Sequence, residues 1–225
     1  MDLTITPDNI IYWQRGSITL NATIVFSWLV MAILVLGSWL ITRNLSTGLN
    51  ISRWQSLLEV LVFAIRNQIR EISDQEGDRY LPFVGTLFLF ISVANFLTIV
   101  PRYQPPTGSL SAASALALCV FFAVPIYGIR EQGLINYLRH YVQPSPILLP
   151  FHIISELSRT LALAIRLFGN IMSGSLIGAL LLSIIPLFLP VALNAFGLLI
   201  GQIQAYIFAV LAMVFIASAV RTHQE

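Results

Sequence analysis

The chain has 225 residues, of which 57% are hydrophobic and only 10% are charged, and its formal net charge at pH 7 is +2. The mean hydropathy of +0.83 excludes a soluble domain of this size and indicates a polytopic membrane protein. The single cysteine excludes a disulfide framework, the small net charge gives no reason to expect a nucleic-acid partner, and no metal-binding or nucleotide-binding motif occurs.

Five stretches of the chain are apolar and long enough to cross a bilayer, for which about 20 residues suffice. We therefore expect an all-α membrane protein that forms a single integral membrane domain over residues 1–225. The expected membrane helices lie at residues 18–41, 80–100, 109–129, 147–185 and 191–220. The polar residues 1–17 lack the basic start and the small-residue cleavage site of a signal peptide.

Residues 51–72 show a different pattern, in which apolar side chains alternate with charged and amide side chains at helical spacing. Trp54 and Leu61 belong to the apolar stripe, whereas Glu59 and Arg66 belong to the charged face. A helix with one apolar and one charged face lies in the membrane interface more readily than it crosses the bilayer. We therefore expect one interfacial amphipathic helix here.

The last two apolar stretches are roughly 40 and 30 residues long, which is more than one crossing needs. Helices of that length must tilt strongly or bend to stay within the membrane. Pro186 and Pro190 bracket a short turn between them. The sequence thus predicts two long, tilted helices that form an antiparallel hairpin.

The arginines, which account for all twelve Lys and Arg residues, are distributed unevenly between the expected spans. One side carries Arg43, Arg53, Arg66, Arg70, Arg79, Arg130, Arg139 and Arg221. The other side carries Arg15 and Arg102. By the positive-inside rule, the N-terminus lies outside and the C-terminus lies in the cytoplasm, which requires an odd number of spans and agrees with five.

Arg166 is the most unusual residue, because it lies in the middle of an apolar helix. Such a charge costs a few kcal/mol by insertion scales and about 10 or more in simulations of isolated helices, so a chain that keeps it usually uses it. At 100° per residue, Arg159, Arg166 and Ser173 fall on one line, and Asn170 lies one turn from Arg166. One helix face is therefore predicted to combine cations with neutral polar groups.

No acidic residue lies within a turn or two of Arg166, and Glu156 is the only acid inside the five expected spans. We therefore expect the carboxylate that pairs with Arg166 to come from another polypeptide. Arg159 lies three residues after Glu156, so these two side chains can pair on the helix surface. Two interpretations stay open: the pair reaches to the interface, or it lines an aqueous inlet together with His152.

The last expected helix carries its own polar line, made of Asn194, Gly197, Gly201 and Gln204 at spacings of 3, 4 and 3. Gly197 and Gly201 form a GxxxG pair, which is common where membrane helices pack closely. The line either serves packing or faces the preceding helix, where Gln204 would hydrogen-bond to the guanidinium of Arg166.

Neutral polar residues also occur near the outer ends of the second and third expected spans. They are Asn95, Thr98, Ser109, Ser111 and Ser114. Hydroxyl and amide side chains in membrane helices can pave a path for water, and they are also common packing residues. Both interpretations stay open from the sequence alone.

The segment Arg166-Leu-Phe-Gly-Asn170, together with Gln204-Ala-Tyr-Ile-Phe208 on the following helix, resembles subunit a of the F-type ATP synthases. The resemblance covers most of the chain and is also recognisable at Pro105-Pro-Thr-Gly-Ser-Leu110. It implies a stator subunit of a bacterial inner membrane, without a nucleotide site or bound cofactor of its own. The implied partners are membrane lipid, the rotating ring of c subunits, subunit b and the rest of the F1Fo complex.

The resemblance also implies roles for individual residues. Arg166 would match the essential arginine, which keeps the ring carboxylate ionised and separates two half-channels that load and unload H⁺ or Na⁺. Asn170 and Gln204 would match its polar neighbours. The other residues of the implied ion pathway are Ser173, Ser175, Glu156, Arg159, His152, Asn95, Thr98, Ser109, Ser111 and Asn194.

The chain departs from the family pattern at several positions where many members carry titratable groups or, at the position of Ser111, an asparagine. These positions hold Ser175, Gly197, Thr98, Ser109 and Ser111. The outer half-channel has therefore lost its titratable groups, which suits a water-filled path or a path of neutral oxygens for Na⁺. This pattern is similar to the alternative, N-type bacterial ATPases, which are thought to move sodium.

Two other classes of function stay open. A self-contained ion channel or secondary transporter predicts an inverted repeat, broken helices or an internal acidic site, and we find none of these beyond Glu156. A structural assembly protein predicts that Arg166 is neutral to substitution. The substitution Arg166→Lys therefore separates the assembly protein from the stator subunit.

Overall fold

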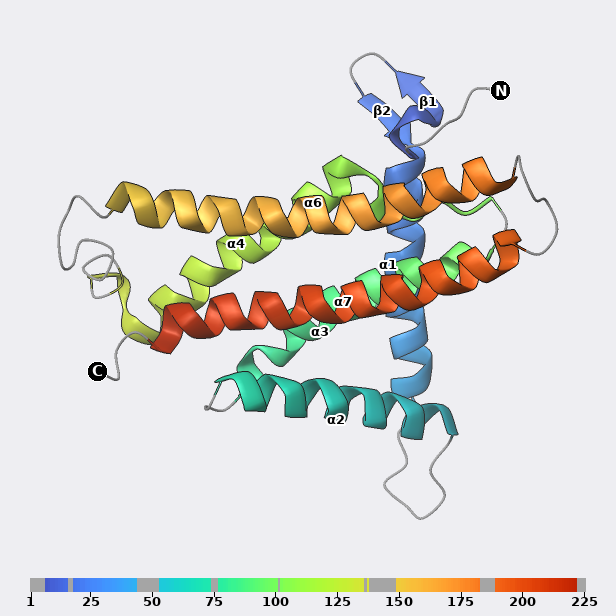
Figure 1. Cartoon of the computed structure of the whole chain (residues 1–225). Coiled ribbons are helices and arrows are strands. Elements are labelled where there is room, and N and C mark those ends of the chain that lie inside the picture. The colour runs from blue at the N-terminus through green and yellow to red at the C-terminus, as the bar shows by residue number, and fades with distance from the viewer. Residues whose placement is uncertain are drawn as a thin grey trace.

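The computed structural model describes residues 7–15, 18–43, 53–73, 77–100, 102–135, 137, 149–182 and 189–221 (Figure 1). The long helices are α1 (Ala22–Thr42), α2 (Arg53–Ser73), α3 (Leu81–Phe96), α4 (Leu110–Gln132), α6 (Leu149–Leu182) and α7 (Leu189–Arg221). Shorter elements are the 3₁₀ helices η1 (Pro7–Asn9), η2 (Gly77–Arg79), η3 (Leu97–Ile99) and η4 (Pro106–Gly108), and the strands β1 (Ile11–Arg15) and β2 (Ile18–Asn21).

Five of the described helices are long and apolar enough to cross a membrane, which confirms the all-α membrane class. These segments are Ala22–Thr42, Leu81–Ile99, Leu110–Gln132, Pro150–Leu181 and Ala192–Val220. The predicted boundaries at residues 51–52, 147–148 and 183–185, the turn at residue 186 and the basic residue at 139 lie outside the described residues.

The start of the first predicted span differs from the expectation. Residues 18–21 form β2, which pairs antiparallel with β1, and α1 begins only at Ala22. The β-branched residues Ile18 and Thr19 favour an extended strand, and their apolar character alone does not separate a strand from the beginning of a helix. The polar N-terminal segment is therefore a small hairpin that stands at the beginning of α1.

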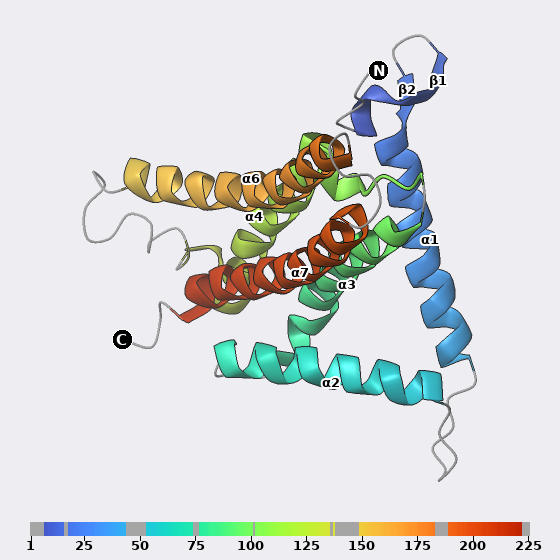
Figure 2. The same cartoon turned by 45° about the vertical axis from the view of Figure 1, so that its right-hand side comes forward.

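α2, α6 and α7 run roughly along one direction, and α1 runs steeply across it (Figures 1 and 2). α1 runs along one side of the molecule, with the β1–β2 hairpin at its beginning and α2 near its end. α6 and α7 lie side by side, run in opposite directions and are strongly inclined to α1. Since α6 has 34 residues and is therefore ~50 Å long, it fits a bilayer core about 30 Å thick only when tilted. The antiparallel pairing is confirmed, and the inclination of α6 and α7 to α1 is consistent with the predicted tilt.

The main core lies where α3, α4, α6 and α7 meet. Leu163 and Leu167 of α6 are 2% and 0% exposed and pack with Ala205 and Phe208 of α7. Lipid chains are as apolar as these side chains, so close packing holds membrane helices together, and small residues such as alanine permit it. A second cluster around Ile69 links α2 to α3 and α7.

α2 is the amphipathic helix that the sequence predicts, and it runs beside α7 (Figure 1). The hydroxyl of Tyr206 in α7 donates a hydrogen bond to Oε1 of Gln68 in α2, at 2.8 Å. On the charged face, Arg66 forms an ion pair with Asp78, in which its Nε donates to Oδ1 at 2.5 Å. The hydrogen bond from Arg66 holds the pKa of the Asp78 carboxyl below its usual value.

Candidate functional site

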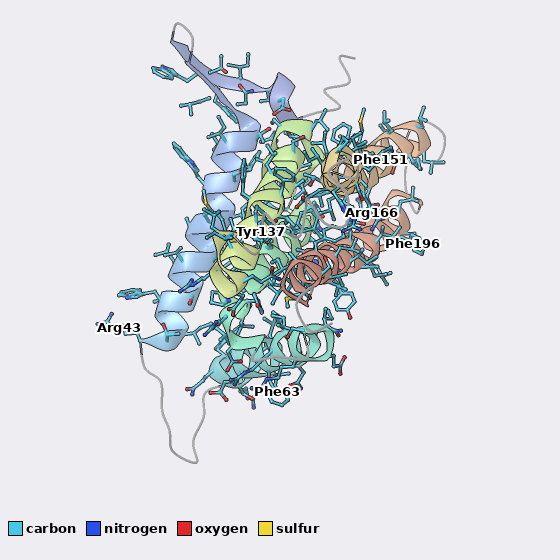
Figure 3. The ribbon with its side chains drawn as sticks, turned by 90° about the vertical axis from the view of Figure 1, so that its left-hand side faces the viewer. Arg43, Phe63, Tyr137, Phe151, Arg166 and Phe196 are labelled. Atoms are coloured by element: carbon cyan, nitrogen blue, oxygen red, sulfur yellow. The ribbon has the colours of Figure 1, made fainter. Side chains whose placement is uncertain are left out.

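Arg166 lies on the face of α6 that is turned away from the core. Leu163, Ala164 and Leu167 are buried on one side of the helix, while Arg159, Arg166 and Ser173 are all exposed. Figure 3 places Arg166 between the ribbons of α6 and α7, on the side of the molecule away from α1. The structure thus brings the three residues of the predicted line onto one accessible face.

The Arg166 guanidinium has no hydrogen bond or ion pair to any of the residues that the structure describes. The neighbouring hydroxyls bond to their own helix: Ser173 donates to the carbonyl of Asn170 at 3.1 Å, and Ser175 donates to the carbonyl of Met172 at 2.8 Å. Among the described residues, these serines therefore form no hydrogen bond to another helix. The charge of Arg166 stays available to a group from outside the described chain.

The predicted polar line on α7 is divided between two environments. Asn194 and Gly197 are exposed, whereas Gly201 and Gln204 are buried. Gly201 faces α3 rather than α6, because its carbonyl accepts a hydrogen bond from Nδ2 of Asn95 at 2.7 Å. Gln204 is 7% exposed, and its Nε2 has no hydrogen-bond partner among the described residues. The hydrogen bond that Arg166 would donate to Oε1 of Gln204 is likewise not among the hydrogen bonds of the described residues.

Asn95 belongs to a polar seam between α3 and α7 that sequence reasoning found only in part. Ser92 donates to Oε1 of Gln202 at 2.5 Å, and Nε2 of Gln202 donates back to the carbonyl of Ser92 at 3.0 Å. Thr98 donates to the carbonyl of Asn95 at 2.6 Å. Oδ1 of Asn95 is buried without a partner among the described residues, which is where a water molecule would complete the bonding.

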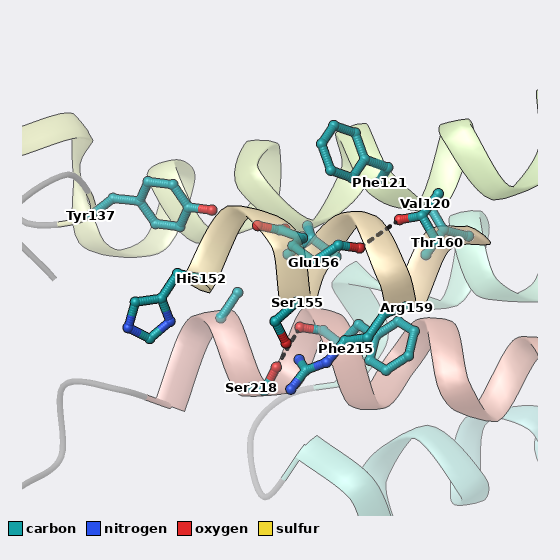
Figure 4. Close-up of a pocket in the computed structure, with 12 residues that line it drawn as sticks. Val120, Phe121, Tyr137, His152, Ser155, Glu156, Arg159, Thr160, Phe215 and Ser218 are labelled. Carbon is teal, nitrogen blue, oxygen red and sulfur yellow. Dashed lines mark hydrogen bonds between the residues drawn. The ribbon is translucent and has the colours of Figure 1, made fainter. Parts of the chain in front are cut away.

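A pocket of about 210 Å³ opens between α4, α6, α7 and Tyr137 (Figure 4). His152, Glu156 and Arg159 line it, as the inlet interpretation of the sequence requires. The guanidinium of Arg159 lies 5.5 Å from the ring centroid of Phe215. At ~30 Å³ per molecule, the pocket holds roughly seven waters. Sequence reasoning missed Tyr137, whose hydroxyl points toward Glu156 in Figure 4.

Ser109 and Ser111 lie in a second polar cluster at the other end of the bundle, beside the N-terminal hairpin. Ser109 donates to Oδ2 of Asp8 at 2.5 Å, and the two serine hydroxyls are 2.6 Å apart. Thr23 of α1 donates to Oδ1 of Asp8 at 2.6 Å. No sequence signal relates Asp8 to these serines, which follow it by about a hundred residues.

The pocket and the η4 turn, which adjoins the Asp8 cluster, contact α6 on opposite sides of Arg166. The pocket reaches along α6 as far as Thr160, which is six residues before Arg166. The η4 turn, which precedes Ser109, packs on α6 at Ile171, which is five residues after Arg166. At 1.5 Å per residue these separations are ~9 Å and ~8 Å along the helix. Arg166 thus lies between two separate polar regions.

A family model described as the ATP synthase A chain matches residues 24–217. The chain is 66% identical over 223 residues to "ATP synthase subunit a 1" of Crocosphaera subtropica, an alignment that covers 99% of this chain and 97% of that protein. It is 58% identical over 219 residues to "ATP synthase subunit a" of Albidiferax ferrireducens, with 97% and 95% covered. These full-length similarities and the five apolar helices agree on one assignment: the chain belongs to the ATP synthase subunit a family.

Proposed function

We propose that the chain is the ion-translocating stator subunit of the Fo sector of a rotary ATP synthase. In this proposal it forms two half-channels that load and unload H⁺ or Na⁺ on a ring of c subunits, and Arg166 separates them. The chain binds no cofactor of its own, and ATP chemistry belongs to partner subunits. The position of Arg166, on an exposed face of α6 between two polar regions, carries the proposal.

The electrostatics of Arg166 supply the mechanism. A guanidinium stays charged in every environment, and in a membrane it strongly favours the ionised form of a nearby carboxyl group. A ring carboxylate that reaches Arg166 therefore releases its ion and stays ionised as it passes. The same positive charge repels a free cation, so an ion in one half-channel does not leak into the other without riding on the ring.

Each polar region has a place in the proposed path. The pocket with His152, Glu156 and Arg159 is the cytoplasmic half-channel, since Ser218 and Ala219 also line it and lie near the C-terminal end of α7, which the positive-inside rule assigns to the cytoplasm. The outer half-channel is formed by Asn95, Thr98, Ser109, Ser111, Asn170, Ser173, Ser175, Asn194 and Gln204. Each charge that crosses gains about 2.3 kcal/mol per 100 mV of membrane potential.

In this proposal, other subunits and lipid cover the exposed apolar faces of the chain. The exposed apolar residues of α6 and α7 beside Arg166, such as Ile165 and Phe196, face the c-ring, and lipid and subunit b cover other apolar faces. The complex lies in a bacterial inner membrane, with the N-terminus outside and the C-terminus in the cytoplasm.

Arg166→Lys in the whole complex, reconstituted in liposomes, tests the proposal. Lysine keeps the charge but not the planar fork of donors, so we expect ATP-driven ion transport to be lost. The matched control is Arg43→Lys, because Arg43 is exposed at the end of α1 and stacks on Trp39 at 5.2 Å. The control should transport normally. ATP-driven transport that survives Arg166→Lys unchanged would exclude the proposed role.

The coupling ion is tested in the same liposomes. With a protonophore present, ATP-driven ²²Na⁺ uptake that persists or rises identifies Na⁺ as the ion and the serine-lined path as a sodium inlet. Absence of sodium uptake, together with ATP-driven acidification when the protonophore is omitted, identifies H⁺ and requires that protons reach the ring through water.

A further inference from the structure

Asp8 brings a carboxylate to a place where the membrane helices offer only hydroxyl groups. It belongs to η1, which lies beside the hairpin at the beginning of α1 (Figures 1 and 2). Its Oδ1 accepts a hydrogen bond from Thr23 at 2.6 Å, and its Oδ2 accepts one from Ser109 at 2.5 Å. The Ser111 hydroxyl lies 3.3 Å from Oδ1. Segments that are far apart in the sequence thus bring four oxygen-bearing side chains together.

The chemistry of this cluster suits a small cation. Carboxylate and neutral oxygens are the ligands that hard cations prefer, and carboxylate groups select cations in channel mouths. Each hydroxyl that donates to Asp8 keeps lone pairs with which it can accept or coordinate. Asp8 has no ion pair with any arginine whose side chain the structure describes, so its negative charge is not neutralised there.

Two buried oxygens next to the cluster in sequence also lack partners. Thr107, two residues before Ser109, is 0% exposed, and its Oγ1 has no hydrogen bond among the described residues. The same holds for Oδ1 of Asn21, two residues before Thr23. A buried unsatisfied oxygen is costly and is usually completed by a water molecule or an ion. The two segments that carry Ser109 and Thr23 therefore have spare bonding capacity next to these residues.

The η4 turn connects the Asp8 cluster to α6, because η4 directly precedes Ser109 and packs on α6 near Arg166. A Cβ at Gly108 would lie 2.8 Å from Cγ2 of Ile171, so η4 packs tightly on α6 one residue before Ser109. Ile171 follows Arg166 by five residues. An ion held at Asp8 thus lies at the hairpin side of the bundle and next to the segment that leads to Arg166.

We propose that Asp8, Ser109 and Ser111 form a capture site for the coupling cation, a proton or a sodium ion, at the outer mouth of the ion path. Thr23 only holds the Asp8 side chain in place from α1. The inference rests on the proposed function, because it assumes that ions pass from this side toward Arg166. In it, a residue outside the membrane spans replaces the titratable groups that the outer spans lack.

The experiment compares variants of the whole complex in liposomes during ATP synthesis driven by an imposed ion gradient. The ion concentration is varied on the side of the N-terminal hairpin, in one arm as Na⁺ with a protonophore and in the other as H⁺ without sodium. Asp8→Asn removes the charge and keeps an oxygen acceptor. Thr23→Ala is the matched control, because it removes one hydrogen bond to Asp8 and keeps the carboxylate.

Asp8→Asn should raise the half-saturating ion concentration about tenfold or more, since a charged mouth raises the local cation concentration by at least that factor. Its maximal rate should change much less, and Thr23→Ala should stay within about threefold of the unsubstituted complex. The arm that shows the rise identifies the ion. Ser111→Lys, at an exposed position, places a positive charge beside an intact Asp8 and should give the same rise even if the Asp8 variant fails to assemble.

An unchanged half-saturating concentration in Asp8→Asn or Ser111→Lys would overturn the capture site. Equal effects of Asp8→Asn and Thr23→Ala would also overturn it, since they would show that Asp8 only ties the hairpin to the bundle. The Arg166→Lys complex separates this failure from failure of the proposed function. If Arg166→Lys abolishes coupling while Asp8→Asn changes nothing, the stator function stands and only the capture site is wrong.

Discussion

Gly201 should tolerate no side chain, although the equivalent change at Gly197 should be harmless. A Cβ at Gly201 would lie 3.0 Å from both Cγ and Nδ2 of Asn95, whereas a Cβ at Gly197 would meet nothing within 4 Å. Asn95 is 2% exposed and donates a 2.7 Å hydrogen bond to the carbonyl of Gly201, so it has little room to withdraw. Gly201→Ala must therefore push α3 and α7 apart or displace the amide.

The size of the effect follows from three contributions. Overpacking a tight contact costs about 1–3 kcal/mol. Loss of the interhelical hydrogen bond of Asn95 costs about 0.6–2 kcal/mol. Alanine in place of glycine recovers about 0.5–1 kcal/mol of helix propensity. We therefore expect Gly201→Ala to lose about 1–4 kcal/mol of stability, while Gly197→Ala gains up to about 1 kcal/mol.

The assay is denaturation of the purified chain in mixed micelles by sodium dodecyl sulfate, followed by circular dichroism. A double-mutant cycle with Asn95→Ala completes it: once the amide is removed, Gly201→Ala should cost much less than it does alone. Equal midpoints for Gly201→Ala and Gly197→Ala would refute the reasoning. Full additivity in the cycle would show that Asn95 is not the obstacle.

Three further predictions concern other parts of the chain. The hydrogen bond from Arg66 lowers the pKa of Asp78 in the folded state, so the ionised carboxylate stabilises the fold at pH values above its ordinary pKa of 3.8. This stabilisation is lost as the pH falls through the lower pKa of the folded state. In an acid titration of helix content, Asp78→Asn should abolish this pH-dependent loss. Gln132→Leu removes hydrogen bonds of 2.8 and 3.0 Å to the carbonyls of Ala219 and Val220, so hydrogen exchange in the last turn of α7 should speed up about tenfold, and unchanged exchange would contradict this. Glu156→Gln should slow ATP-driven transport about tenfold, whereas Ser218→Ala in the same pocket should change it little; equal rates would exclude a role for the Glu156 charge.

Hydropathy predicts the membrane helices well, because each must be apolar along most of its length to lie in lipid. The observed α3, α4, α6 and α7 begin and end within a few residues of the expected positions. Hydropathy alone places the beginning of the first span four residues too early, because Ile18–Asn21 is apolar enough to continue α1 but pairs with β1. Hydropathy measures transfer to lipid and does not tell a strand at the surface from the first turn of a helix.

The site was predictable only where it lies on one helix. Helical periodicity places Arg159, Arg166 and Ser173 on one face, and all three are exposed together. Contacts between helices depend on crossing angles, which no periodicity contains, so Gly201 was not predicted to meet Asn95. The contact between Asp8 and Ser109 could not be predicted for the same reason, because it joins two segments that are far apart in the sequence.

The steep inclination of α6 explains why this helix is longer than one crossing requires. If α6 ran along the membrane normal, the residues before and after Arg166 would differ only in their depth in the membrane. In a helix that is inclined to the membrane normal, part of the same separation lies within the plane of the membrane. Thr160, at the edge of the pocket, and Ile171, beneath η4, are eleven residues apart along α6, which is ~16 Å along its axis.

In the proposed function, a displacement within the plane of the membrane suits a partner that rotates in this plane, the ring of c subunits. If both half-channels opened at one point, an ion could pass from one to the other without any rotation, and the gradient would do no work. In the proposed function, two openings that are separated along α6, with the Arg166 charge between them, force the ion onto the ring and make rotation the only connection. The length of α6, the fixed charge in its middle and the polar regions on either side would then act together, and loss of any one of them should uncouple transport from rotation.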